Sequence, residues 1–188
     1  MLAWVAKGVH HRSVRRAVIL IGVTVGVVGL LSWSLDSFGA RSVWFAFCVV
    51  WLPMVWLGTV SRFVVPRLPA SYHALREFEL DGRIYEILGV RLVKWLLRRG
   101  PLAVFNPDLH IPKERTPAKL AHLEQRMKDA EASHFILLVL TLGVVFHAAA
   151  RGWWGAAAWT LLFDVLVNGY PVMLQRYNRS RLRQRFGR

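Results

Sequence analysis

The sequence predicts an all-α, polytopic membrane protein of about four transmembrane helices with a further amphipathic helix at the membrane interface. Of the 188 residues 55% are hydrophobic, and they gather in blocks of the roughly 20 residues that a membrane-crossing helix needs. Lys and Arg flank these blocks rather than interrupt them, and the nine tryptophans are typical of a protein whose helix ends lie at lipid headgroups. No alternating pattern of the kind that predicts a β-strand is convincing.

Four apolar segments are predicted to cross the membrane: residues 17–35, 43–60, 135–150 and 153–174. The first two carry no charged residue, and the third has only one ionisable residue, His147. A cleaved signal peptide is the competing interpretation of the first segment. We favour an uncleaved anchor, because the apolar run is longer than a usual signal and Phe38-Gly39-Ala40 is a poor cleavage site.

The distribution of Lys and Arg predicts the orientation of the chain in the membrane. Four lie in residues 1–16, thirteen in residues 61–134 and six in residues 175–188, whereas the two remaining loops carry one each, Arg41 and Arg151. Because positively charged loops stay on the cytoplasmic side, we expect a multi-pass protein of the cell membrane with both termini cytoplasmic.

A single membrane domain is therefore expected over residues 1–188, with residues 61–134 as a cytoplasmic and interfacial segment and residues 175–188 as a basic cytoplasmic tail. Within the middle segment, residues 86–99 read as a basic amphipathic helix lying on the membrane, ended by Gly100-Pro101. Residues 105–117, with three prolines, are predicted to form a loop. Thr116-Pro117 then begins a long helix that continues into the third span.

Composition excludes several functions. Cys48 is the only cysteine, so an internal disulfide and a cysteine-based zinc site are excluded. The net charge of +14 suits either nucleic acid or anionic lipid, but no nucleic-acid-binding motif is present and the basic residues flank apolar blocks. Anionic lipid headgroups are therefore the expected partners, and no nucleic acid is expected.

Glu131 and His134 are the first candidate site. On a helical projection they fall on one stripe with Leu120, Leu123, Met127 and Ala130, where the helix enters the lipid, and their spacing of three residues lets them interact. A histidine oriented by a carboxylate can act as a general base. An interfacial ion pair is the simpler alternative. Metal is not expected, because helical-bundle metal sites use two such motifs and only one is present.

The fourth span carries a polar ridge: Asp164, Asn168, Pro171, Gln175 and Asn178 are spaced by four, three, four and three residues. Polar groups inside a membrane are costly and usually face the bundle interior. The ridge continues into Gln175-Arg176-Tyr177-Asn178-Arg179 and Arg181, a string suited to phosphate, carboxylate or anionic headgroups. We therefore predict a binding site at the cytoplasmic interface; helix–helix hydrogen bonding and a plain basic flank are the alternatives.

At these residues the chain resembles the glycosyl-diaponeurosporenoate acyltransferases, small membrane proteins of staphyloxanthin-type carotenoid-glycoside biosynthesis. The matching motifs are Ala130-Glu131 with His134, Asn168 with Pro171, and Gln175-Arg176-Tyr177-Asn178-Arg179 with Arg181. A weaker match covers Tyr85-Glu86, Gly89 and Lys94. The resemblance spans roughly residues 61–181. It departs from the family at Arg126, where a glutamate is frequent, and the first span is additional.

The resemblance implies transfer of a fatty acyl group to a sugar hydroxyl of a carotenoid glycoside or related glycolipid. His134, oriented by Glu131, would then be the base. Asn168, Gln175 or Asn178 would stabilise the oxyanion, and Arg176, Arg179 and Arg181 would hold the phosphates of a donor. Tyr177, Asp164 and Lys94 complete the expected substrate-binding residues. The acyl donor, an acyl-CoA or acyl carrier, is expected as a co-substrate, with no bound cofactor and membrane lipid and lipid glycoside as partners.

Two other functions stay open at this point. A non-catalytic lipid-binding or assembly subunit would use the polar ridge against a partner and the arginines against anionic lipid. A small transporter is disfavoured, since four spans would need an oligomer and no inverted repeat is visible. The sequence also leaves homo-oligomerisation open.

Overall fold

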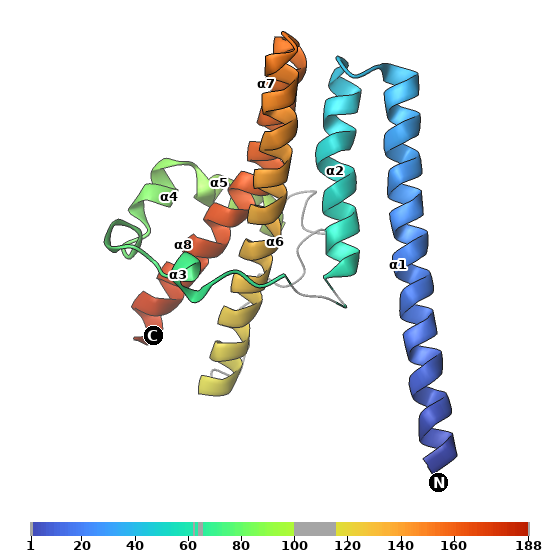
Figure 1. Cartoon of the computed structure of the whole chain (residues 1–188). Helices are drawn as coiled ribbons and strands as arrows, with labels where there is room; N and C mark the ends of the chain where they lie inside the picture. Colours follow the sequence, from blue (N-terminus) through green and yellow to red (C-terminus); the bar gives the residue numbers. More distant parts are fainter. Residues whose placement is uncertain (1, 62, 64–65, 100–115, 188) are drawn as a thin grey trace. The chain divides into compact units, whose positions relative to one another are not determined.

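The computed structural model describes residues 2–61, 63, 66–99 and 116–187, and this part of the chain is helical without a strand (Figure 1). The all-α class is therefore confirmed. Four described helices are long and apolar enough to cross a membrane. The chain divides into two compact units, Met1–Val65 with Val139–Asp164, and Pro66–Leu138 with Val165–Arg188.

The first unit consists of α1 (Leu2–Phe38), α2 (Val43–Val60), the C-terminal part of α6 (Pro117–Ala150) and α7 (Trp154–Asp164). Helix α2 packs against both α1 and α7 (Figure 1). A hydrogen bond of 2.8 Å from Trp56 Nε1 to Thr24 Oγ1 joins α1 to α2. The side chains of α1 that remain exposed are largely apolar, as expected of a helix that faces lipid.

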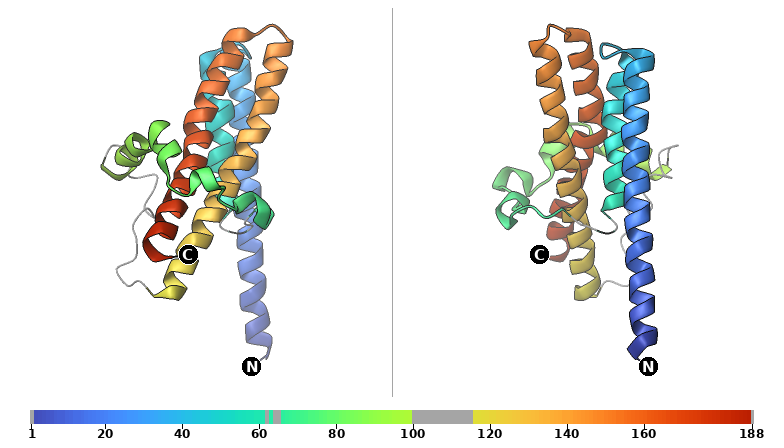
Figure 2. Two further views of the ribbon diagram at one scale, coloured as in Figure 1. Left: turned by 90° about the vertical axis from the view of Figure 1, so that its left-hand side faces the viewer. Right: turned by 45° about the vertical axis from the view of Figure 1, so that its right-hand side comes forward.

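Two short turns connect the helices of the first unit. Gly39 has φ +76° between α1 and α2, and Gly152 has φ +71° between α6 and α7 (Figure 2). After the first turn, the Ser42 hydroxyl caps α2 by accepting hydrogen bonds from the amides of Trp44 and Phe45. These turns are the two loops in which the sequence has only one basic residue each.

The second unit contains α3 (Ala70–His73), the 3₁₀ turn η1 (Glu77–Glu79), α4 (Arg83–Ile87), α5 (Val90–Arg99), the N-terminal part of α6, the π-helical turn η3 (Val165–Gly169) and α8 (Tyr170–Phe186). Its apolar core is formed by Tyr85, Val90, Leu174 and Tyr177, which bring α4, α5 and α8 together. This core is small, and the charged groups described below make further contacts between the elements.

Helix α6 confirms the long helix predicted from Thr116-Pro117 into the third span. The Thr116 hydroxyl accepts a hydrogen bond of 3.4 Å from the Lys119 amide, and Pro117 is the first helical residue. The predicted inward stripe is observed in part: Leu120 and Glu131 are buried and the other stripe residues are partly buried. Of the residues predicted opposite, His122 and Gln125 are exposed but Asp129 is partly buried.

The predicted amphipathic helix 86–99 is wrong at its start. The structure has two helices, α4 and α5, which Gly89 separates with φ +79°, a backbone conformation that other residues rarely adopt. Gly82, before α4, has φ +72°, and a Cβ atom there would lie 3.1 Å from Ser180 Oγ and 3.2 Å from the Tyr177 ring. The close approach of this turn to α8 therefore requires glycine. Gly100-Pro101 and residues 105–115 of the predicted loop lie outside the described residues.

The helical structure of the fourth predicted span, 153–174, continues into the predicted tail. Helix α7 passes through η3 into α8, and the predicted tail is helical as far as Phe186. Pro171 cannot donate a hydrogen bond to Val167 and its ring crowds that carbonyl, so a wider π-helical turn before it relieves the clash. Because a π turn changes the angle per residue, the ridge projected from Asp164 to Asn178 is not a straight line on one α-helix.

Candidate functional site

The Glu131 carboxylate is the centre of the charged cluster of the second unit. Its side chain is completely buried on α6. Oε1 accepts a hydrogen bond of 2.7 Å from Arg176 Nη1, and Oε2 is paired with Arg179 Nη1. His73 Nδ1 lies 3.6 Å from Oε2. A buried carboxylate is tolerated when it is paired and hydrogen-bonded, and two guanidinium groups from α8 meet that requirement here.

Arg176 uses all of its N–H groups within the protein. Nε and Nη2 bind the two oxygens of Glu79 at 2.6 and 2.7 Å, an arrangement that holds a carboxylate bidentately. Nη1 also donates to the Tyr72 carbonyl and Nη2 to the Ala74 carbonyl, both at 3.1 Å. Arg176 therefore ties α8 to α6 and to the segment around α3 and η1.

Glu79 is held as a carboxylate by this arrangement. Burial acts to raise its pKa, but the hydrogen bonds from Arg176, Tyr85 and the Arg76 amide outweigh burial and lower the pKa from 4.5 to about 2. The Tyr85 hydroxyl donates to Glu79 Oε1, and burial together with this carboxylate raises the pKa of Tyr85. Tyr85 thus remains a protonated donor.

Arg179 is almost completely buried between Glu131 and α3. Nη1 pairs with Glu131, Nη2 donates to the His73 carbonyl, and Nε has no hydrogen-bond partner among the described residues. His73 itself lies against Glu131, and burial lowers its pKa more than the neighbouring carboxylate raises it. His73 is therefore a neutral group at neutral pH.

A second cluster of polar contacts joins α8 to α4 and α5. Glu86 accepts a hydrogen bond of 2.9 Å from the Tyr177 hydroxyl and pairs with Arg181. Lys94 Nζ donates to Asn178 Oδ1 at 2.7 Å and lies 5.2 Å from the centre of the Tyr177 ring. Lys94, Tyr177, Asn178 and Arg181, which were predicted as substrate-binding residues, are thus close together in the structure.

His134 lies apart from both clusters. Its Nδ1 is 3.2 Å from Asn168 Oδ1 in the π-helical turn η3. Nε2 has no hydrogen-bond partner in the described part of the chain. His134 is therefore a partly buried residue of the second unit, with Nδ1 held by an amide and no partner at Nε2 among the described residues.

The predicted Glu131–His134 contact is not the one that the structure contains. Glu131 is bound to Arg176, Arg179 and His73, and His134 is bound to Asn168. The physical reason is charge: a buried carboxylate gains more from two permanent cations than from an imidazole. The orienting group for His134 is thus the Asn168 amide in η3 rather than the carboxylate on its own helix.

The remaining predicted residues have different places. Asp164 is completely buried but belongs to the first unit, and Gln175 is half-buried in α8. Tyr72, His73 and Glu79 were not predicted to take part in the site. One feature of the sequence could have indicated Glu79. The chain has only 11 Asp and Glu residues against 25 Lys and Arg, so a glutamate between the apolar residues Phe78 and Leu80 is a natural partner for a buried arginine.

The described residues contain no group of three or more His, Cys, Asp or Glu side chains that could hold a metal ion. What they contain is an imidazole that contacts an amide through one nitrogen, on a helix held by a set of buried ion pairs. Fold and site together define an all-helical membrane protein with a candidate acid–base group.

The family model of glycosyl-4,4'-diaponeurosporenoate acyltransferase matches residues 69–188, which is more than half of the chain. The chain belongs to this acyltransferase family, as its motifs indicated. The match covers both clusters and the His134–Asn168 pair. No curated protein and no solved structure matches the chain.

Replacing Glu131 by Gln is expected to destabilise the protein by about 3 kcal/mol or more, because Arg179 would lose the counter-charge that makes its burial tolerable. The measurement is the unfolding midpoint of the purified protein in detergent. Glu124→Gln is the matched control on the same helix. Glu124 is 30% exposed and paired only with Lys128, so its loss should cost no more than about 1 kcal/mol. Equal midpoints for the two variants would refute a central role for Glu131.

Stability is expected to fall as the pH drops from about 4.5 towards 2. The folded pKa of Glu79 lies below its ordinary value, so its contribution is complete above 4.5 and is lost as the folded carboxylate is protonated near 2. The measurement is the unfolding midpoint over this pH range. Glu79→Gln should flatten the dependence, and Glu77→Gln, an exposed neighbour, should not. A wild-type slope unchanged in Glu79→Gln would contradict the assignment.

Proposed function

We propose that this chain transfers a fatty acyl group from a thioester donor to a hydroxyl group of a lipid glycoside, with His134 as the general base. The family supports acyl transfer to a carotenoid glycoside. The observation that carries the choice of base is the pairing of His134 Nδ1 with Asn168 Oδ1, which leaves Nε2 unbonded.

Asn168 defines the protonation pattern of the ring. A carboxamide oxygen can only accept a hydrogen bond, so Nδ1 must carry the proton that it donates. Nε2 of the neutral ring then has a lone pair and can accept a proton from a hydroxyl group. The same contact fixes the ring orientation. Because an amide carries no charge, it leaves the imidazole neutral before the reaction. The ring then takes up a proton only when the hydroxyl group attacks.

The proposed reaction forms one ester bond and breaks one thioester bond. His134 Nε2 takes the proton of the acceptor hydroxyl as its oxygen attacks the thioester carbonyl carbon. The tetrahedral intermediate collapses with cleavage of the carbon–sulfur bond, and the imidazolium returns the proton to the leaving sulfur. The products are the acylated glycoside and the free thiol. Of the predicted oxyanion donors, the Gln175 amide makes no side-chain hydrogen bond among the described residues and is therefore available.

The buried ion pairs have a positioning role in this proposal. All N–H groups of Arg176 are engaged with Glu79, Glu131, Tyr85 and backbone carbonyls, and the charge of the buried Arg179 is balanced by Glu131, so neither arginine is placed to hold the phosphates of a donor. Their function is to hold α6 against α8. Since His134 is on α6 and Asn168 precedes α8, this contact sets the distance between base and amide.

We further propose that the second unit faces the cytoplasm in the cell membrane, with both termini on that side. The concentration of Lys and Arg in residues 1–16, 61–134 and 175–188 supports this orientation, since the turns at Gly39 and Gly152 have one basic residue each. A cytoplasmic site is where a thioester donor is available.

His134→Ala is expected to abolish the acylated glycolipid, because the variant lacks the imidazole that is proposed to take the hydroxyl proton. The measurement is lipid mass spectrometry of cells that express the chain, compared with cells that do not. Asn168→Ala should lower product formation at least tenfold by releasing the ring, since a positioned base contributes a factor of about 10² to 10⁴.

His122→Ala is the matched control, because His122 is an exposed histidine on the same helix. It should leave the product unchanged. Retained product in a folded His134→Ala variant would rule out the base. A lipid profile unaffected by the wild-type chain would favour the lipid-binding or assembly function instead.

The proposed orientation predicts which positions a membrane-impermeant thiol reagent can reach in intact cells. Starting from Cys48→Ala, which removes the only cysteine, Arg41→Cys and Arg151→Cys should be labelled from outside. Arg185→Cys, near the end of α8, should be labelled only after the cells are opened. Labelling of Arg185→Cys in intact cells would contradict the orientation.

A further inference from the structure

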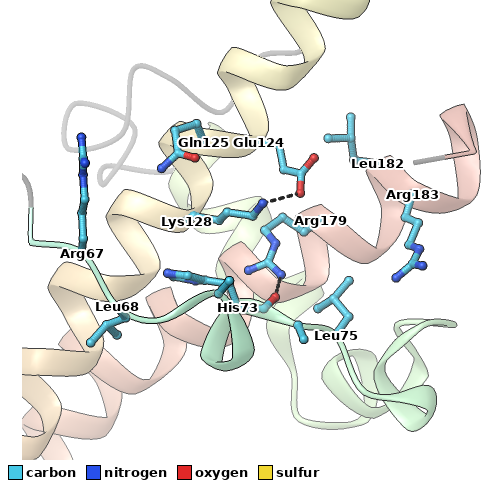
Figure 3. Close-up of a pocket in the computed structure, with 12 residues that line it drawn as sticks. Arg67, Leu68, His73, Leu75, Glu124, Gln125, Lys128, Arg179, Leu182 and Arg183 are labelled. Atoms are coloured by element: carbon cyan, nitrogen blue, oxygen red, sulfur yellow. Dashed lines mark hydrogen bonds and ion pairs between the residues drawn. The ribbon is translucent and has the colours of Figure 1, made fainter.

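A pocket of about 390 Å³ lies within the second unit, beside the Glu131 cluster (Figure 3). Its wall comes from the segment around α3, from the first turns of α6 and from α8. Three leucines, Leu68, Leu75 and Leu182, give it apolar surface. The volume falls in the range of small-molecule sites, which is about 300 to 1,000 Å³.

The charged residues of this pocket are predominantly basic. Arg67, Lys128, Arg179 and Arg183 line it, and Glu124 is the one carboxylate among the lining residues. Lys128 is neutralised by Glu124 at 2.9 Å, and Arg179 by Glu131. Arg67 and Arg183 differ from these two, because neither makes a side-chain hydrogen bond or ion pair within the described part of the chain. In the close-up they stand at opposite ends of the group of lining residues (Figure 3).

Two uncommitted guanidinium groups around a partly apolar cavity are suited to a ligand with more than one phosphate. Guanidinium binds phosphate through paired N–H groups, and separated arginines can hold separated phosphates. His73, also in the wall, has a pKa lowered by burial and adds no charge at neutral pH. The positive field of the pocket therefore comes from groups that remain charged at any physiological pH.

The pocket has a defined place along α6 relative to the base. Glu124 and Lys128 precede His134 by ten and six residues, and at 1.5 Å per residue these positions lie about 15 and 9 Å from it along the helix axis. A donor anchored here by phosphates needs an extended arm to bring its thioester to His134. The pantetheine arm of coenzyme A is such a connection.

We infer that this pocket binds the phosphate-bearing end of a coenzyme A thioester, with Arg67 and Arg183 as the phosphate ligands. The inference rests on the proposed acyl transfer and names its donor. It also moves phosphate binding away from the predicted Arg176-Arg179-Arg181 set, of which only Arg179 lines the pocket and does so while bound to Glu131.

The test is equilibrium binding of coenzyme A to the full-length protein in nanodiscs of phosphatidylcholine. Arg67→Gln and Arg183→Gln should each raise the Kd about tenfold, the effect of one lost charge-assisted contact. 3'-Dephospho-coenzyme A should bind the wild-type protein more weakly and be insensitive to one of the two variants. In turnover, the KM for acyl-CoA should rise by a similar factor, with kcat within twofold of wild type.

Arg91→Gln is the matched control for charge. Arg91 lies on α5 with its side chain 72% exposed, and it is not among the lining residues of the pocket. It should bind coenzyme A as the wild type does. If Arg67→Gln and Arg183→Gln bind coenzyme A no more weakly than Arg91→Gln does, the inference is overturned.

Two further outcomes would also overturn it. If the pocket held a lipid headgroup, the two variants would weaken association with vesicles that contain phosphatidylglycerol and would leave coenzyme A binding unchanged. If the donor were an acyl carrier protein, the wild-type protein would not bind coenzyme A but would still form the acylated glycolipid from the acylated carrier. In that last case acyl transfer itself stands, so failure of the donor assignment is distinguishable from failure of the proposed function.

Discussion

The buried carboxylate of Glu131 has to be neutralised, and the way in which this is done determines the arrangement of the second unit. Two arginines of α8 pair with it, and the same arginines bind Glu79 and the carbonyls of Tyr72, His73 and Ala74. One carboxylate on α6 thereby brings α8 and the segment before α4 to the same place. The apolar core of this unit is small, so these ion pairs fix positions that packing alone would leave loosely defined.

As a consequence, Arg176 and Arg179 of the family motif contact carboxylates inside the protein. The arginines at 176 and 179 stabilise the unit, and the proposed chemistry is assigned instead to His134 and to Arg67 and Arg183 at the pocket. The π-helical turn before Pro171 belongs to the same arrangement, because it contains Asn168 and presents its amide to His134. Wide turns of this kind frequently occur at functional positions in helices. Structural charge and proposed chemistry are thus carried by different residues of one motif.

Much of the fold could be predicted from hydropathy and helix-start signals: the boundaries of α2, the long α6 from Thr116 and the four candidate spans all follow from local sequence. The site was harder, for physical reasons that can be named. Helical periodicity placed Glu131 and His134 on one buried face, but it does not say which segment packs against that face. Tyr72 and His73 do so from 59 and 58 positions before Glu131. Gly89 and Pro171 change the backbone locally, which a uniform angle of 100° per residue does not represent.

Catalysis by this chain alone is measured most directly by reconstituting the purified protein in phosphatidylcholine vesicles with a lipid glycoside and one radiolabelled acyl-CoA. The expected result is acylated glycoside and free coenzyme A in equal amounts, formed at a rate proportional to the amount of protein. Product that appears only when a second membrane protein is added, with the folded chain inactive by itself, would contradict the assignment of the base to His134 and make this chain a partner of the true catalyst.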